Sequence, residues 1–254
     1  MFKEEYQVLC NGAAGKNKLL KNNPLGYFVS ALVAGMFISF GSFVAFTLGG
    51  IISASETAAC WAKPVQAFAF ASALSLVVMA GAELFTGNNL AMAAGSFRKV
   101  VSWADTVKLW VVCWIGNLVG SLLCVGLFQV TGIPSGDTAA YFGKTAVTKV
   151  GLEPVPLLVR AILCNVLVCL AVWCAAKMKT EAGKLIMIFW CIFIFMVCGF
   201  EHSIANMSIL GVAVANGSIG VGQYCYSVLL ATVGNMIGGV VFVALPYHLI
   251  SKEK

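Results

Sequence analysis

Six apolar runs, each long enough to cross a lipid bilayer, constrain the fold of this sequence more than any other feature. A transmembrane helix needs about 20 predominantly apolar residues. Of the 254 residues, 60% are hydrophobic and only 10% are charged, a composition that soluble globular domains do not have. The sequence therefore predicts an all-α polytopic membrane protein with six transmembrane helices. The runs cover approximately residues 24–52, 64–97, 106–130, 157–176, 185–215 and 226–250.

The N-terminal residues 1–23 are polar and basic and contain no apolar stretch of signal-peptide length, so we expect no cleaved signal. Within this segment, an amphipathic helix at the membrane surface is predicted over residues 4–20. Its apolar face would contain Tyr6, Leu9, Ala13 and Leu20.

The six runs fall into two groups of three, over residues 24–130 and 157–250, joined by a long loop over residues 131–156. The whole chain, residues 1–254, is expected to form a single membrane domain. An even number of spans places both termini on one side. Of the 16 Lys and Arg residues, all but four fall on that side, which the positive-inside rule assigns to the cytoplasm. The four exceptions are Lys63, Lys144, Lys149 and Arg160.

Two of the runs are interrupted by polar and ionisable residues. Residues 83–89 read Glu-Leu-Phe-Thr-Gly-Asn-Asn, and residues 199–207 read Gly-Phe-Glu-His-Ser-Ile-Ala-Asn-Met. Ionisable groups at membrane depth are costly and mark functional sites by default. Non-helical backbone is tolerated there only where it is buried in protein or lines a cavity. The second and fifth runs are therefore predicted to be broken helices.

The two halves of the chain match when one is shifted by 118 positions. The alternative is chance identity among common membrane residues, but the interruptions and the Gly-Asn pairs align independently. Each half has three spans, an odd number, so the second half must enter the membrane in the opposite sense. Inverted repeats with broken helices are typical of transport proteins. The matches are Gly81 with Gly199, Glu83 with Glu201, Asn88 with Asn206, Asn117 with Asn235, and Gly120 with Gly238.

The repeat also isolates one difference, because His202 falls on Leu84. A purely structural interruption has no need of that asymmetry, so His202 is the candidate for pore chemistry, although a packing role for the imidazole is the alternative. The matching residues are predicted to be structural, capping freed backbone N–H groups or holding the neighbouring segment. They are Glu83, Glu201, Asn88 and Asn206.

Five motifs resemble the formate/nitrite transporter family, and the likeness extends over about residues 24–247. This resemblance implies an aquaporin-like six-helix fold and a homopentamer with one pore per subunit in the cytoplasmic (inner) membrane of a prokaryotic-type cell. It implies passage of small monovalent anions of weak acids, namely formate, nitrite, hydrosulfide or lactate, without enzyme activity, cofactor or metal. The motifs lie at residues 82–88, 116–120, 163–173, 199–207 and 234–239.

The resemblance also implies roles for individual residues. The pore residues would be His202, Thr86, Asn235 and Lys149. An outer constriction would be formed by Leu84 and Phe195, and an inner one by Phe70 and Leu74. Gly87, which follows Thr86, favours the nitrite and hydrosulfide branches over the formate branch.

A mechanism follows from these roles. Lys149 and Arg160 would draw anions to the outer mouth. An anion that gains a proton between the constrictions would cross the apolar rings as a neutral acid, because desolvation favours the uncharged form. His202 could supply that proton, or it could polarise the site while water supplies it.

Two other functions are compatible with a six-helix bundle. An aquaporin-like pore for neutral solutes would be expected to show Asn-Pro-Ala at both breaks, where this chain has Gly-Asn-Asn and Ala-Asn-Met. A membrane-embedded haem or redox subunit needs axial ligands at membrane depth, and only His202 is deep. The ten cysteines include no Cys-x-x-Cys pair, so they give no metal-binding pattern.

Overall fold

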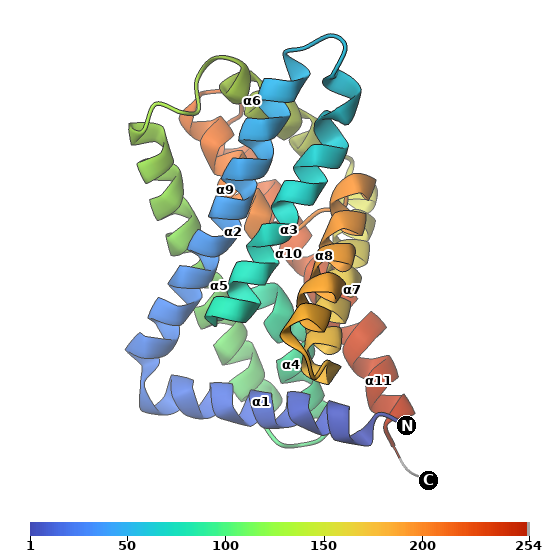
Figure 1. Ribbon diagram of the computed structural model, residues 1–254. Helices are drawn as coiled ribbons and strands as arrows, with labels where there is room; N and C mark the ends of the chain where they lie inside the picture. The colour runs from blue at the N-terminus through green and yellow to red at the C-terminus, as the bar shows by residue number, and fades with distance from the viewer. Residues whose placement is uncertain (253–254) are drawn as a thin grey trace.

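Within residues 1–252, the six apolar runs form six membrane-length helical spans, as the sequence predicted. A computed structural model describes residues 1–252 (Figure 1). The long helices are α2 (Pro24–Ser53), α3 (Ala62–Ala80), α5 (Trp103–Val130), α7 (Pro154–Lys177), α8 (Glu181–Cys198) and α10 (Val221–Gly239). A 3-10 turn, η1 (Ala59–Trp61), precedes α3, and α10 continues through a π-helical turn, η2 (Val240–Ala244), into α11 (Leu245–Ile250).

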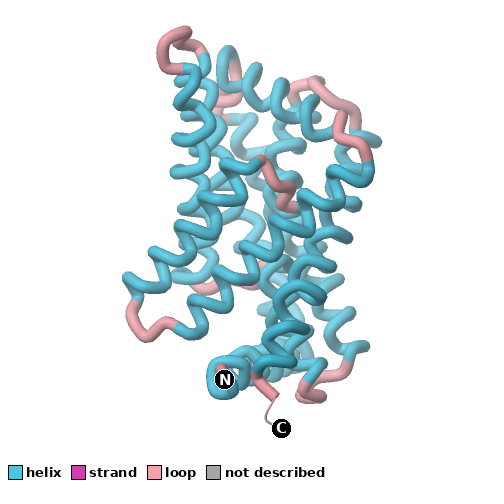
Figure 2. Tube along the Cα trace, turned by 90° about the vertical axis from the view of Figure 1, so that its right-hand side faces the viewer, coloured by secondary structure: helices cyan, strands magenta, loops and turns pink. Residues whose placement is uncertain are grey.

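The second and fifth apolar runs are each divided into two helices, which confirms the prediction of two broken helices. Gly81 (φ 81°) follows the end of α3 and Gly199 (φ 72°) follows the end of α8, both at positive φ values that glycine adopts without steric cost. After an extended stretch, the shorter helices α4 (Phe85–Phe97) and α9 (Ser203–Ala215) begin. Figure 2 shows loop segments (pink) within the body of the molecule as well as at its ends.

The inverted repeat is confirmed by matching contacts in the two halves. Gly120 of α5 lies against the Leu32 carbonyl of α2, and Gly238 of α10 lies against the Ile162 carbonyl of α7. A side chain at either glycine would prevent this close approach of the helices. The backbone N–H of Glu83 donates to Ser30 O, and that of Glu201 donates to Arg160 O, both at 3.3 Å.

Each repeat is also preceded by a helix that lies across one end of the bundle. α1 (Lys3–Asn22) crosses the end where both termini lie, and α6 (Gly136–Val150) lies at the opposite end (Figure 1). We call these ends the α1 side and the α6 side. The prediction of an amphipathic α1 is confirmed. Its buried face, which packs mainly on α4 and α2, consists of Tyr6, Leu9, Cys10, Ala13 and Leu20.

The expectation of a loop over residues 131–156 was wrong, because α6 occupies most of it. This helix is short and contains Gly143 as well as β-branched residues, which lower helix propensity. It is stabilised instead by packing of Phe142 and Ala146, both fully buried, against α2 and α9.

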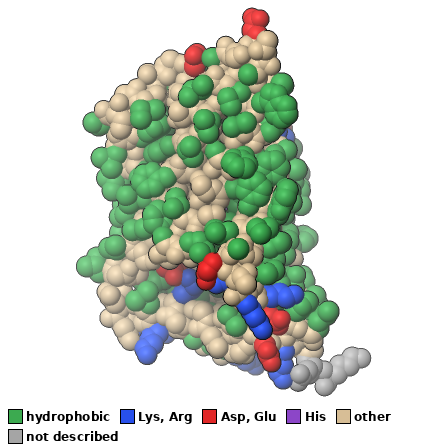
Figure 3. Space-filling model, in the orientation of Figure 1, with side chains coloured by type: hydrophobic (Ala, Val, Ile, Leu, Met, Phe, Trp, Pro, Cys, Tyr) green, Lys and Arg blue, Asp and Glu red, His purple; other side chains and the backbone are tan. Residues whose placement is uncertain are grey.

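The surface has the pattern expected for a membrane protein. Large apolar side chains remain exposed along the spans, as at Leu122 (45% exposed), Leu127 (56%) and Phe242 (56%). On the face shown in Figure 3, hydrophobic side chains cover the middle, and most charged side chains gather towards the α1 side. Contiguous exposed apolar surface of this kind marks contact with lipid or with another protein.

Candidate functional site

His202 lies at the second helix break, where it begins α9. Its Nδ1 accepts the backbone N–H of Ala205 at 3.0 Å and so caps the helix. Its Nε2 lies 3.1 Å from Thr86 Oγ1. Because Nδ1 is an acceptor, the neutral ring carries its proton on Nε2 and donates it to Thr86. The ring stacks on Phe195 with centroids 5.9 Å apart, and only 4% of His202 is exposed.

Thr86 lies in the first turn of α4, so the His202–Thr86 contact joins the N-termini of both half-helices. Thr86 is fully buried. The N-terminus of a helix carries a positive partial charge and unpaired N–H groups, and it therefore favours anions. Opposed half-helices create such a place in the middle of a membrane protein. The contact thus offers a small anion the Thr86 hydroxyl, and the His202 N–H where the anion replaces Thr86 as its acceptor, in a favourable electrostatic field.

Two cavities approach this contact from opposite sides. The α6-side cavity, of about 210 Å³, is lined by His202, Phe195, Lys149, Glu201 and Arg160 among others. The α1-side cavity, of about 390 Å³, is lined by Lys16, Glu83, Leu84, Leu74 and Gly87 among others. Neither set of lining residues includes Thr86, which therefore lies between the two cavities.

The apolar layers around the contact are arranged differently from the expected pairing. Phe70 packs edge-on against Phe195, with centroids 5.9 Å apart, on the α6 side of α3. Leu74, one turn further along α3, lines the α1-side cavity together with Leu84. Leu84 lies on the connection from α3 to α4, which faces the α1 side. Hence one layer is Phe70 with Phe195, and the other is Leu74 with Leu84.

Asn235 lies beside His202, but both of its amide hydrogens are used by the protein. Its Nδ2 donates to the carbonyls of Ala161 (2.7 Å) and Glu201 (2.9 Å), and its Oδ1 accepts the N–H of Ser203 (2.9 Å). No donor remains for an anion, so the expected role of Asn235 in the pore needs correction. The amide instead satisfies backbone groups freed by the helix break.

Asn117 makes the equivalent contacts in the first repeat. It accepts the N–H of Phe85 (2.9 Å) and donates to the carbonyls of Ala31 (2.7 Å) and Glu83 (2.9 Å). The two Gly-Asn pairs found in the sequence thus serve the same structural purpose. They clamp the extended segment of each broken helix to the neighbouring long helix.

The glutamates at the breaks hold the end helices rather than cap the backbone with their side chains. Glu201 binds Lys149 of α6 and Asn206, both at 2.8 Å. Glu83 binds Lys16 of α1 at 2.6 Å and Asn88 at 2.9 Å. The charge of Lys149, which the resemblance assigns to the outer vestibule, is therefore balanced by a carboxylate that is 3% exposed.

Two residues of the site, Lys16 and Asn165, were not predicted from the sequence. Asn165 Nδ2 donates to Thr86 O (3.3 Å), Asn89 Oδ1 (3.0 Å) and Asn235 O (2.6 Å) and so ties α4 to α10. A signal was available for Asn165, because it is the one amide within the apolar run of α7. Lys16 gave no such signal, because it is one of several lysines in a polar segment.

The site offers hydrogen bonds and a positive local field, but no arrangement for holding a metal. Within residues 1–252, no group of three or more His, Cys, Asp or Glu side chains is placed to bind an ion. Both ring nitrogens of His202 already have protein partners. The arrangement is suited to the transient binding of a small solute.

Comparison with known proteins gives consistent matches along the chain. A family model described as formate/nitrite transporter matches residues 4–249. The nitrite transporter NirC of Escherichia coli (strain K12) is 34% identical over 258 residues, covering 97% of this chain and 91% of NirC.

Two solved structures are similar to this fold. A structure described as an FNT family ion channel superposes with a TM-score of 0.92 at 30% identity, covering 99% of this chain and 100% of that one. A pentameric formate channel with formate bound has a TM-score of 0.74 at 27% identity, covering 89% of this chain and 96% of that one.

Proposed function

Because this chain belongs to the formate/nitrite transporter family, we propose that it is a channel for small monovalent anions of weak acids. One observation carries the proposal. The buried His202–Thr86 contact lies between two cavities that approach it from opposite sides, and an apolar layer lies on each side of it. A solute that moves from one cavity to the other meets the side chains of His202 and Thr86 at this contact.

The apolar layers select for solutes that can shed their charge. Stripping an ion of water costs several kcal/mol even after the protein relaxes. The anion of a weak acid avoids this cost by taking up a proton, and desolvation in the narrow region favours that neutral form. Chloride, whose conjugate acid is strong, cannot use this route.

His202 acts in this proposal as a hydrogen-bond donor, and water in the cavities supplies the proton. The ring of His202 holds one proton, on Nε2, while Nδ1 caps α9. Giving up the Nε2 proton would leave an anionic ring, and a second proton on Nδ1 would remove the cap. The imidazole therefore orients and polarises the solute beside Thr86 without exchanging its own proton.

Nitrite is the first substrate to test, followed by formate and hydrosulfide. The nitrite transporter NirC is 34% identical to this chain over 258 residues, and a similar solved structure holds formate. Hydrosulfide has the weakest conjugate acid of the three and would be protonated most readily. Gly87 after Thr86 also favours nitrite and hydrosulfide over formate.

The assembly that we propose is a homopentamer in the cytoplasmic membrane with both termini in the cytoplasm. A similar solved structure is a pentamer, and large apolar side chains remain exposed along the spans. The α1 side has most of the basic residues, which places it in the cytoplasm by the positive-inside rule. Native mass spectrometry of the protein in detergent measures the number of chains.

Anion flux into proteoliposomes tests the function. Purified protein is compared with two variants, His202→Asn and Thr86→Val, for uptake of nitrite, formate, hydrosulfide, chloride and glycerol at two pH values. Asparagine is a good N-cap, so His202→Asn keeps the start of α9 but loses the Nε2 donor. We expect faster weak-acid uptake at the lower pH. We also expect the uptake rate of each variant to fall about tenfold or more, because each variant loses one buried hydrogen-bond donor.

The outcomes separate the possible pores. Uptake of weak-acid anions but not of chloride, reduced in both variants, supports the proposal. If chloride passes as fast as the weak-acid anions, and His202→Asn does not change the flux, the protein is instead a size-selective anion channel. Uptake of glycerol without anions would instead show a neutral-solute pore.

A further inference from the structure

The two cavities that approach His202 differ in the charged groups that line them, although the repeats are otherwise closely matched. Lys149 with Glu201 on the α6 side corresponds to Lys16 with Glu83 on the α1 side. Beyond these pairs, the α1-side cavity has no charged lining residue among residues 1–252. The α6 side has three further cations, Lys63, Lys144 and Arg160.

The repeat shows where this difference arises. The carbonyl of Arg160 accepts the N–H of Glu201, and the carbonyl of Ser30 accepts the N–H of Glu83. Ser30 therefore stands where Arg160 stands in the other half. Lys144 lies five residues before Lys149 on α6, and the same step back from Lys16 on α1 reaches Asn11.

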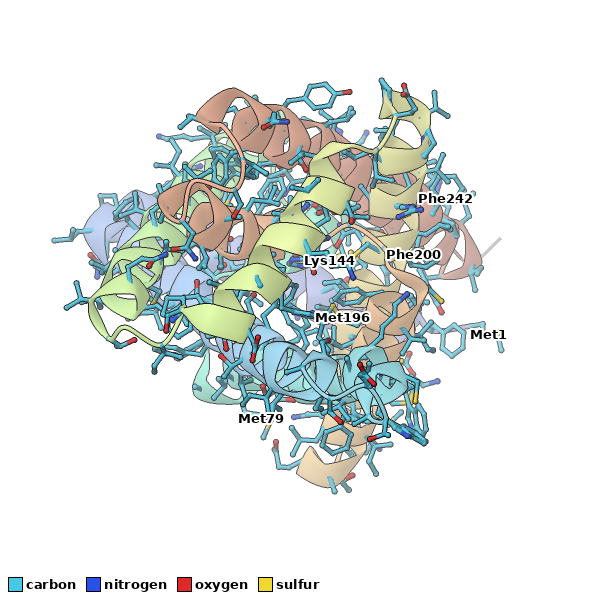
Figure 4. All side chains as sticks on the ribbon, turned by 90° about the horizontal axis from the view of Figure 1, so that it is seen from above. Met1, Met79, Lys144, Met196, Phe200 and Phe242 are labelled. Carbon is cyan, nitrogen blue, oxygen red and sulfur yellow. The ribbon has the colours of Figure 1, made fainter. Side chains whose placement is uncertain are left out.

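The three cations line the α6-side cavity or the groove beside it: Lys63 lines both, Arg160 lines the cavity and Lys144 lines the groove. A groove of about 480 Å³, lined by Lys63, Lys144 and Gln66 among others, shares Lys63 and Gln66 with the α6-side cavity. Lys63 Nζ lies 3.8 Å from the position that a Cβ would take on Gly199, so it reaches the helix break. In the view from the α6 side, Lys144 lies towards the middle of the molecule in the same region as Met196 and Phe200 (Figure 4).

None of the three cations is neutralised by a carboxylate. Within residues 1–252, the ion pairs do not include Lys63, Lys144 or Arg160. Asp137, in the first turn of α6, is the one carboxylate that lines the groove. Groove and cavity together thus have four cations against two carboxylates, whereas the α1-side cavity has one of each.

A buried amide adds a fixed donor to this region. Gln66 is only 7% exposed. The hydroxyl of Tyr141 donates to Gln66 Oε1 at 3.1 Å, which fixes the orientation of the amide. The NH₂ group of Gln66 has no hydrogen-bond partner among residues 1–252, and Gln66 lines both the groove and the cavity. Such an oriented donor among unpaired cations suits a small anion.

We propose that Lys63, Lys144 and Arg160, together with the amide of Gln66, form an anion-binding site on the α6 side that the α1 side lacks. Its ligand is a small monovalent anion such as nitrite or formate, held before it passes Phe195. The site makes the two mouths of the pore unequal. Anions presented on the α6 side saturate the pore at a lower concentration than anions presented on the α1 side. This inference rests on the proposed function.

The test measures nitrite flux from each side separately. Right-side-out and inside-out membrane vesicles containing the full-length protein present the two mouths to the added nitrite. The concentration for half-maximal flux is measured at an ionic strength of about 0.15 M supplied by gluconate, so that long-range fields are screened equally. The variants Lys144→Asn and Arg160→Ser install the residues of the α1 side.

We expect wild type to show a lower half-maximal concentration from the α6 side. Each variant should raise that value about twofold to fivefold, as for loss of one exposed or half-exposed charge contact, and leave the α1-side value unchanged. The reciprocal variant Asn11→Lys should lower the α1-side value. Lys108→Asn, which removes an exposed lysine of α5 on the α1 side, should change neither value.

A charge-balanced variant separates a binding site from a general surface field. Glu153 begins α7 on the α6 side and does not line the groove or the cavity. Glu153→Gln combined with Lys144→Asn therefore restores the net charge without restoring the site, and the half-maximal concentration should stay raised. Recovery of the wild-type value, or equal values from both sides in wild type, would overturn the inference. Absence of any weak-acid flux in wild type would instead refute the proposed function.

Discussion

Replacing Asn235 with alanine tests whether this residue clamps the helix break or lines the pore. The substitution removes three hydrogen bonds, to Ser203 N, Glu201 O and Ala161 O. Ala161 O lies within α7, where the helix itself supplies a donor. The other two groups belong to the break, and water is excluded from both because Ser203 and Glu201 are buried.

The magnitude follows from those two orphaned groups. A buried polar group left without a partner costs about 1–3 kcal/mol, so Asn235→Ala should lower the free energy of unfolding by about 2–6 kcal/mol. Asn117→Ala should cost less, about 1–3 kcal/mol, because Phe85 N loses its partner whereas Glu83 O keeps the Cys113 thiol as a donor at 3.2 Å. The inverted repeat thus predicts a loss in each half of the chain, and the loss is larger at Asn235.

The measurement is reversible unfolding in mixed micelles with increasing SDS. Ser227→Ala is the matched control on α10, since Ser227 is buried but its Oγ has no hydrogen-bond partner among residues 1–252. We expect that control to cost less than about 1 kcal/mol. The clamp would be refuted if Asn235→Ala unfolded like the control and yet abolished anion flux, because that pattern belongs to a residue that binds the solute.

Two further predictions concern packing and charge. Gly120→Ala should destabilise the protein by about 1–3 kcal/mol because its Cβ would meet the Leu32 carbonyl. Gly126→Ala, on the same helix with open space around it, should be neutral or stabilising. Equal SDS midpoints for the two variants would contradict the close approach of α2 and α5. Lys149→Met should cost about 3–5 kcal/mol by leaving Glu201 as an unpaired buried charge. The double variant Lys149→Met/Glu201→Gln should recover part of that loss in the same unfolding assay, and an additive loss would show that the pair is not coupled.

Much of the fold could be predicted because its determinants are local in the sequence. A span must be apolar over its whole length, so the six runs are visible without any knowledge of their partners. A break at membrane depth must contain polar groups that satisfy its own backbone, so Glu83 and Glu201 mark both breaks. The shift of 118 positions then relates the two halves, and the inverted arrangement follows from the odd number of spans.

The end helices depend more on tertiary contacts. The apolar face of α1 was recognised from Tyr6 and Leu9, whereas the glycine and threonine residues of α6 made that segment resemble a loop. Packing of Phe142 and Ala146 against α2 and α9 makes that segment a helix. Because the glutamates of the breaks reach Lys16 and Lys149 across the chain, no local pattern indicated those pairs.

The sequence by itself determined that this is a membrane bundle with two broken helices and a histidine at one break. Only the tertiary structure decided which groups face the pore. Leu84 lines the same cavity as Leu74 because the connection after α3 faces the α1 side. Asn235 has no N–H left to offer a solute because its two N–H donors are bound by carbonyls of other segments. The physical reason is that hydropathy is a property of each residue, whereas the satisfaction of a buried polar group depends on partners distant in the sequence.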